Sequence, residues 1–168
     1  FDLETTGLSP QDCAITEIGA VVVENGEIGE SYNSFANPGV HIPENITKLT
    51  GITDDMVKDA PGQEQAVRDF LRFVDGRVLV AHNAHGFDIR FIKAACERYG
   101  IEFRHTYIDT LPLAQSLYIG LRNYKLDTIG KYLEIPPFEH HRACDDARAL
   151  AQIFVKMVED LSLRGVQE

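Results

Sequence analysis

The sequence predicts an α/β domain in which a mixed sheet is flanked by helices, and three observations predict it. Residues 1–35 have the pattern of strands joined by tight turns. The rest alternates between short apolar strands and amphipathic helices. The length of 168 residues, 44% of them hydrophobic, suits one hydrophobic core. We therefore expect residues 1–168 to form a single domain, with three antiparallel strands followed by strand and helix alternation.

The first three strands are defined by the turns between them. Residues 1–5 have the pattern of a strand that ends at a Thr-Thr-Gly turn, and residues 15–23 form a second, rich in small and β-branched side chains. Asn25-Gly26 is the typical sequence of a type I′ hairpin, so a third strand should return over residues 27–35. These strands should form an antiparallel meander.

A helical corner follows the strands. Pro43 suits a helix start, Gly51 suits the position beyond a helix end, and Thr53 suits the N-cap of a second helix. Two short helices are therefore expected within residues 43–59. Beyond them, apolar periodicity predicts helices at about residues 63–74, 87–99, 110–118, 126–133 and 143–161, and strands at 78–81 and 106–109.

Charge and composition limit the classes of protein that fit. There are 26 Asp and Glu against 16 Lys and Arg, a net charge of −10, and residues 1–47 contain no Lys or Arg. Such a domain should bind a nucleic-acid backbone weakly, because that affinity comes largely from basic side chains.

Cys13, Cys96 and Cys144 form no C-x-x-C pair, which favours a reducing, cytoplasmic location. No sequence segment has the length and apolarity of a membrane span. Because Phe1 already lies in a strand, we expect the domain to be part of a longer chain.

Four acidic residues lie at unusual positions. Asp2 and Glu4 are two apart on a strand and share one face. Asp88 and Asp146 lie near the starts of two helices, beside their apolar stripes. Taken singly, each fits a solvent-facing strand position or a first-turn acid near a helix N-terminus. Together, clustered acids repel one another and need compensating positive charge, which no nearby Lys or Arg obviously provides. Two divalent cations would provide it, and carboxylate oxygens favour Mg²⁺ or Mn²⁺ over zinc.

His141 lies five residues before Asp146, just upstream of the same helix. Without context, a histidine at a helix start is usually a capping or surface residue. Beside a hydrated metal site, however, an imidazole that titrates near neutral pH can take a proton from an attacking water. His141 is therefore a candidate general base.

Three motifs occur in order along the chain. They are Phe-Asp-Leu-Glu-Thr-Thr-Gly at residues 1–7, Val-Ala-His-Asn-Ala at 80–84 leading to Asp88, and His-Arg-Ala-Cys-Asp-Asp at 141–146. Together they resemble the DEDDh superfamily of 3′→5′ exonucleases, in the branch with a catalytic histidine. Within it the chain is most similar to the exonuclease domain of PolC-type DNA polymerase III. That similarity comes from Phe-Ala-Asn-Pro at 35–38, Leu-Thr-Gly-Ile-Thr-Asp-Asp-Met at 49–56 and Ile-Asp-Thr-Leu at 108–111.

The resemblance implies a ribonuclease H-like fold and a two-metal site. Asp2, Glu4 and Asp146 would surround one metal, and Asp2 would also reach a second metal that Asp88 helps to hold. His141 would be the general base. The products would be 5′-mononucleotides, released during proofreading for a replicative DNA polymerase.

The resemblance also implies partners and a substrate-binding turn. Thr5, Thr6 and Gly7 would hold the terminal nucleotide of a single-stranded DNA 3′ end. A polymerase module, in cis or in trans, would be the protein partner. The second motif is one residue longer than in common relatives, and Gly86 should absorb that residue in a bulged turn before Asp88.

Three alternatives stay open. A DEDDh exoribonuclease that trims RNA would share all five catalytic residues and differ in its treatment of the 2′-hydroxyl. A phosphatase with an aspartyl nucleophile would need Asp-x-Asp and a catalytic lysine, whereas Glu4 occupies the second acidic position here. A non-catalytic nucleic-acid-binding module on the same fold would be indicated by the loss of at least one of the four acids.

Overall fold

The computed structural model describes residues 1–165 and begins with the expected antiparallel meander. Strands β1 (Asp2–Thr5), β2 (Ile15–Glu24) and β3 (Glu27–Phe35) form a sheet in the order β1-β2-β3. Asn25 and Gly26 have φ values of 53° and 76°, the two left-handed residues that a type I′ turn requires. The hairpin pairs Glu24 with Glu27, and an irregularity between Val21 and Val23 then shifts the register, so that Glu17 of β2 pairs with Phe35 of β3.

The remaining elements also follow the predicted order. They are α1 (Glu44–Thr50), α2 (Asp54–Val57), α3 (Gln63–Phe73), β4 (Leu79–Ala81), α4 (Asp88–Tyr99), β5 (Tyr107–Asp109), α5 (Thr110–Leu117), α6 (Leu126–Tyr132) and α7 (Ala143–Leu163). In the predicted corner, Pro43 is the N-cap of α1, Gly51 ends it in the left-handed conformation, and the Thr53 side chain accepts from the Met56 amide. The corner is confirmed.

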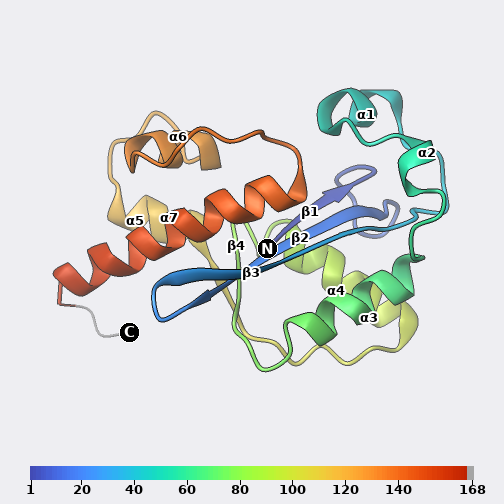
Figure 1. Ribbon diagram of the computed structural model, residues 1–168, viewed down its shortest axis with the longest axis horizontal. Helices are drawn as coiled ribbons and strands as arrows, with labels where there is room; N and C mark the ends of the chain where they lie inside the picture. The colour runs from blue at the N-terminus through green and yellow to red at the C-terminus, as the bar shows by residue number, and fades with distance from the viewer. Residues whose placement is uncertain (166–168) are drawn as a thin grey trace.

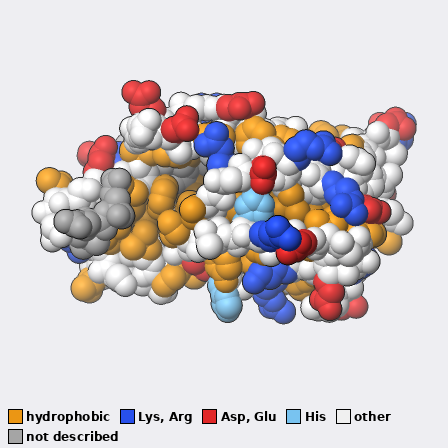
Figure 2. All heavy atoms as spheres, turned by 90° about the horizontal axis from the view of Figure 1, so that it is seen from below, with side chains coloured by type: hydrophobic (Ala, Val, Ile, Leu, Met, Phe, Trp, Pro, Cys, Tyr) orange, Lys and Arg blue, Asp and Glu red, His pale blue; other side chains and the backbone are white. Residues whose placement is uncertain are grey.

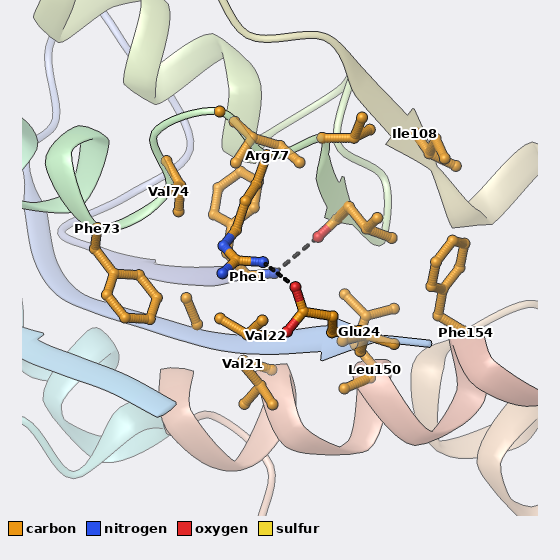
Figure 3. Close-up of a pocket in the computed structure, with 18 of the residues that line it drawn as sticks. Phe1, Val21, Val22, Glu24, Phe73, Val74, Arg77, Ile108, Leu150 and Phe154 are labelled. Atoms are coloured by element: carbon orange, nitrogen blue, oxygen red, sulfur yellow. Dashed lines mark hydrogen bonds and ion pairs between the residues drawn. The ribbon is translucent and has the colours of Figure 1, made fainter. Parts of the chain in front are cut away.

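Strands β4 and β5 form a parallel pair that lies beside β1. The amino group of Phe1 donates to the carbonyl oxygen of Val80 at 2.7 Å, which connects the meander to this pair. Because β1 pairs only with Ile15–Gly19, the following part of β2 borders an apolar groove of about 440 Å³ between β2, β4 and α7. Figure 3 shows Val21, Val22, Leu150 and Phe154 lining this groove.

Helices cover both faces of the sheet (Figure 1). Helix α7 crosses one face and packs on β1, β2 and β3, while α3 and α4 pack together on the other. The main core combines the apolar side chains of β1 and β2 with those of α3 and α4, and a second core joins α5, α6 and α7. Within residues 1–165, no helix is long and apolar enough to cross a membrane.

Candidate active site

Asp2 and Glu4 lie on the face of β1 that α7 covers. The intervening residues, Phe1 and Leu3, are buried in the opposite core with α3 and α4, as the alternation of a strand requires. In the antiparallel register Asp2 pairs with Gly19 and Glu4 pairs with Glu17, so these residues share the same face.

Asp146 comes to this face from the first turn of α7. One carboxylate oxygen each from Asp2, Glu4 and Asp146 lies within 4.8 Å of the others. The Asp146 amide donates to the carbonyl oxygen of Arg142 at 3.0 Å, the first bond of the helix at this residue. Its Oδ2 accepts the main-chain N–H of His141 at 2.8 Å. Three of the four predicted acids are therefore gathered as one potential ligand group.

Asp88 reaches the site from the other side of the sheet. It is the first residue of α4, is buried, and its Oδ1 accepts the main-chain N–H of Leu3 at 3.1 Å. Its carboxylate thus lies at the edge of β1, next to Asp2 but outside the group of three. The resemblance implied that Asp88 helps to hold a second metal with Asp2, and in the structure its carboxylate is also bonded to the main chain of β1.

The electrostatics of the four acids reflect burial and mutual repulsion. Burial and then the charge of Asp146 raise the pKa of Glu4 to about 8. Burial raises the pKa of Asp88 to about 7, although the Phe1 amino group and the Leu3 amide favour its charged form. The pKa of Asp2 is raised well above its ordinary value by burial and then by Asp88. The pKa of Asp146 is also raised by burial, while the His141 amide opposes the shift.

This donor set fits divalent cations. Carboxylate oxygens are the ligands that Mg²⁺ and Mn²⁺ prefer, and their raised pKa values mean that the negative charge lacks compensation within the protein. Arg142 is the basic side chain whose charge lowers the pKa of Glu4, but its guanidinium is paired with Glu17. The residues present therefore fit metal ions at this position.

His141 is brought beside Asp146 through its backbone. It adopts the left-handed conformation with φ of 68°, its main-chain N–H donates to Asp146, and its side chain is exposed. The neighbouring His140 places its Nδ1 3.4 Å from Oδ1 of Asp146. The structure thus puts two histidines at the start of α7, and only one of them was singled out from the sequence.

The Thr5-Thr6-Gly7 turn is tied down by its own side chains. The hydroxyl of Thr5 donates to the carbonyl oxygen of Gly7 at 2.6 Å, and the hydroxyl of Thr6 accepts from the Ala14 amide at 3.0 Å. Gly7 lets the turn pack closely on Cys13, since a Cβ there would lie 2.7 Å from the Sγ of Cys13. These contacts fix the conformation of the turn, which directly follows Glu4.

The lengthened loop before Asp88 is accommodated by a compact turn. The amides of Gly86 and Phe87 both donate to the carbonyl oxygen of Asn83, whose φ is 58°. The left-handed residue is Asn83, while Gly86 allows a close approach, since a Cβ there would lie 2.4 Å from the Asn83 side chain. Sequence reasoning identified the glycine but missed the asparagine.

Glu17 and Arg142 are functional candidates that sequence reasoning missed. Glu17 is fully buried on β2, and both its oxygens contact the start of α7. The signal in the sequence was a lone acid in the otherwise apolar and small-residue segment Ile15–Ala20. Its partner is 125 residues away, so the pairing had no local signature.

Residues 1–154 match the exonuclease family RNase_T, which is most of the chain. The chain belongs to this exonuclease family. A DNA polymerase III PolC-type from Caldanaerobacter subterraneus subsp. tengcongensis is 48% identical over 167 residues, 99% of this chain and 12% of that protein. The Bacillus subtilis protein of the same description is 41% identical over 170 residues, again 99% and 12%. The chain thus spans 12% of the length of these relatives.

Solved structures agree with the family. Exonuclease X in complex with 5′ overhanging duplex DNA has a TM-score of 0.74 and 27% identity, covering 99% of this chain and 92% of that one. The nuclease domain of 3′hExo, a DEDDh family member bound to rAMP, has a TM-score of 0.77 at 21% identity over 95% and 90%. The resemblance to DEDDh exonucleases and to PolC, and with it the ribonuclease H-like α/β fold, is confirmed. Membership of the family also implies dependence on divalent metal ions, for which the carboxylate group offers ligands.

Proposed function

We propose that this domain removes nucleotides one at a time from the 3′ end of single-stranded DNA, as the proofreading exonuclease of a replicative polymerase. The observation that carries the proposal is the convergence of Asp2, Glu4 and Asp146 within 4.8 Å, with Asp88 at the adjoining strand edge. The order of these acids, with His141 before the last, agrees with the motifs of the exonucleases that the sequence resembles, apart from the one extra residue before Asp88. The identity to PolC-type polymerases supports DNA as the substrate.

Each side chain has a role in this hydrolysis. Asp2, Glu4 and Asp146 would hold one cation, and Asp2 with Asp88 would hold a second, either Mg²⁺ or Mn²⁺. When bound, the cations supply positive charge that stabilises the attacking and leaving oxygens. His141 accepts a proton from the attacking water, whose oxygen bonds to phosphorus while the bond from phosphorus to the O3′ of the preceding nucleotide breaks, and that O3′ takes up a proton from solvent water. A 5′-mononucleotide is released.

The Thr5-Thr6-Gly7 turn forms the surface against which the terminal nucleotide binds. Its hydroxyls are engaged within the turn, so its contribution to binding is shape and main-chain groups. We further propose that the domain works within a longer polymerase chain. Its similarity to one eighth of each PolC relative supports a polymerase module in cis. A cytoplasmic location follows from that role.

The decisive experiment is a time course on matched 5′-labelled DNA and RNA oligomers with Mg²⁺ or Mn²⁺. We expect a one-nucleotide ladder on single-stranded DNA, and no cleavage when the 3′ end is blocked or EDTA is present. An Asp2→Ala variant controls for a contaminating nuclease. Faster shortening of RNA would favour the exoribonuclease alternative, and shortening from the 5′ end or internal cuts would contradict the proposal.

The charge distribution predicts weak binding of DNA by the isolated domain. Its net charge is −10, and Figure 2 shows acidic side chains interspersed among the basic ones on the face in view. Because backbone affinity requires basic side chains, we expect a dissociation constant of about a micromolar or weaker at physiological salt. Tethering to a polymerase would raise the effective DNA concentration. Fluorescence anisotropy with Ca²⁺ in place of Mg²⁺ tests this, and nanomolar binding would indicate an independent enzyme instead.

A further inference from the structure

Glu17 is a fully buried carboxylate that the hydrolysis described above does not use. It lies near the start of β2, directly across the strand pair from Glu4, and its side chain has no exposed surface. An unpaired carboxylate at such a position is strongly unfavourable. Its retention beside a cluster of acids that already repel one another therefore requires specific partners.

Those partners all come from the two residues that follow His141. The Nη2 of Arg142 donates to Oε1 of Glu17 at 3.1 Å and its Nε to Oε2 at 3.2 Å, a bidentate pair. The main-chain N–H of Ala143 also donates to Oε2, at 3.3 Å. Arg142 is further packed over the Phe35 ring, with its guanidinium 5.6 Å from the ring centroid. Both oxygens of Glu17 are thus engaged by the start of α7.

The neighbouring Gly19 permits this close docking. It is the next β2 residue on the same face, and a Cβ there would lie 2.3 Å from the main-chain carbonyl carbon of Ala143. The backbone of α7 therefore rests directly on β2, and Glu17 clamps the segment immediately before it. His141, whose φ is 68°, directly precedes Arg142 and Ala143, the two residues that Glu17 holds. A non-glycine residue in that conformation needs surrounding structure to hold it.

We propose that Glu17 is a positioning residue, which fixes the direction of the His141 side chain by holding Arg142 and the first amide of α7. This inference rests on the proposed function, in which His141 is the general base. Glu17 is not a metal ligand, because its oxygens are bonded to Arg142 and Ala143 and the ligand group consists of Asp2, Glu4 and Asp146. Asp146 keeps its hydrogen bond to the main-chain carbonyl oxygen of Arg142, and Gly19 still docks α7 on β2, when the side chain at position 17 changes, so metal binding should depend little on Glu17.

The kinetic test uses Glu17→Gln, which keeps the shape of the side chain but removes its charge and one acceptor. We expect kcat to fall about 10- to 100-fold, as for a misplaced catalytic group, with KM and the Mg²⁺ half-saturation within about twofold of the parent. Arg142→Lys, which keeps the charge but cannot form the bidentate pair, should act in the same direction and carries the test if Glu17→Gln does not fold. Glu24→Gln, an exposed acid on the same strand, is the matched control and should match the parent.

A double-mutant cycle with His141→Asn separates positioning from general damage. Asparagine tolerates the left-handed conformation but cannot act as the base. If Glu17 acts through His141, adding Glu17→Gln or Arg142→Lys to His141→Asn should lower kcat by less than about threefold. An undiminished loss in that background, a parent-like kcat of Glu17→Gln and Arg142→Lys alone, or a parallel loss of Mg²⁺ affinity would overturn the proposal.

An activity-independent measurement distinguishes failure of this inference from failure of the proposed function. In histidine-labelled protein, the His141 ring resonance, assigned with His141→Asn, should shift or broaden in Glu17→Gln and Arg142→Lys but not in Glu24→Gln. If the parent degrades no nucleic acid, the proposed function fails, and this spectrum still decides whether Glu17 orders His141. An unchanged His141 resonance in both folded variants would contradict the positioning role.

Discussion

Two helix starts bring acids to the same candidate site, and their carboxylates are held by different partners. At the start of α7, the contact with Gly19 docks the backbone, and the Asp146 carboxylate accepts the N–H of the nearby His141 while it lies beside Asp2 and Glu4. At the start of α4, the Asp88 carboxylate itself bonds to the Leu3 amide. The bond of Asp146 is local to its own helix start, whereas the bond of Asp88 ties its helix to β1 and leaves its carboxylate outside the group of three. Acids with the same sequence signature can therefore be held at a site by different kinds of contact.

The largest expected effect is the loss of cleavage when Asp146, at the start of α7, is replaced. Asp146→Asn keeps an acceptor for the His141 amide but removes the charge needed to hold a cation, so cleavage should fall to background, as it should for Asp2→Ala. The adjacent Asp145→Asn, outside the ligand group, is the matched control and should keep the parent rate. Cleavage is measured on 5′-labelled DNA under saturating Mg²⁺. Substantial activity in Asp146→Asn or Asp2→Ala would contradict the assignment of the ligand group.

Next in size is the loss of the proposed base. His141→Asn should lower kcat about 10²- to 10⁴-fold with little change in Mg²⁺ dependence, which is the usual contribution of general-base catalysis. The asparagine tolerates the left-handed backbone at this position, so the melting temperature should stay close to that of the parent. His140→Asn, tested alongside, shows whether the neighbouring imidazole can substitute. A larger effect of His140→Asn than of His141→Asn would transfer the role to His140.

Two substitutions of Asp88 should separate its effect on the free energy of unfolding from its effect on kcat. Asp88→Ala leaves the Leu3 amide without its partner and should cost about 1–3 kcal/mol in unfolding free energy, as well as lowering kcat. Asp88→Asn keeps an acceptor for that amide, so it should unfold closer to the parent while kcat still falls. Denaturant titrations and the cleavage assay measure the two quantities. If Asp88→Asn is as active as the parent, Asp88 has only the structural duty.

The smallest effect is on thermal stability, and it depends on pH. Because the pKa of Glu4 rises from its ordinary 4.5 to about 8 on folding, the folded protein binds more protons than the unfolded chain between these values. Without metal, the melting temperature should therefore fall as the pH rises from about 5 to 8. Mg²⁺ replaces those protons, so its stabilisation should be greater at pH 8 than at pH 6, by a few degrees.

Replacement of the titrating group provides the control for this pH dependence. In Glu4→Gln the melting temperature of the metal-free protein should depend less on pH, and Mg²⁺ should stabilise it less. Differential scanning fluorimetry in EDTA and in Mg²⁺ gives both curves. A metal-free parent that becomes more stable as the pH rises through this range would show that the acids are already compensated within the protein.

Much of the fold could be predicted from the sequence, because its determinants are local. Asn25-Gly26 accepts two left-handed residues, Thr53 caps a helix, and alternation along β1 separates Asp2 and Glu4 from the buried Phe1 and Leu3. The family motifs also placed all the candidate site residues in the chain. These features depend on side chains within a few residues of one another, so a single sequence contains them.

By itself, then, the sequence determined the order of the elements, the face that Asp2 and Glu4 share, and the residues that were candidates for the site. Only the tertiary structure decided that Asp146 joins them while Asp88 bonds to Leu3, and that Glu17 clamps Arg142 from 125 positions away. The physical reason is that these arrangements depend on strand register and on how closely a helix docks on a sheet. Both are settled by packing between segments that are distant in the chain, and no local propensity encodes them.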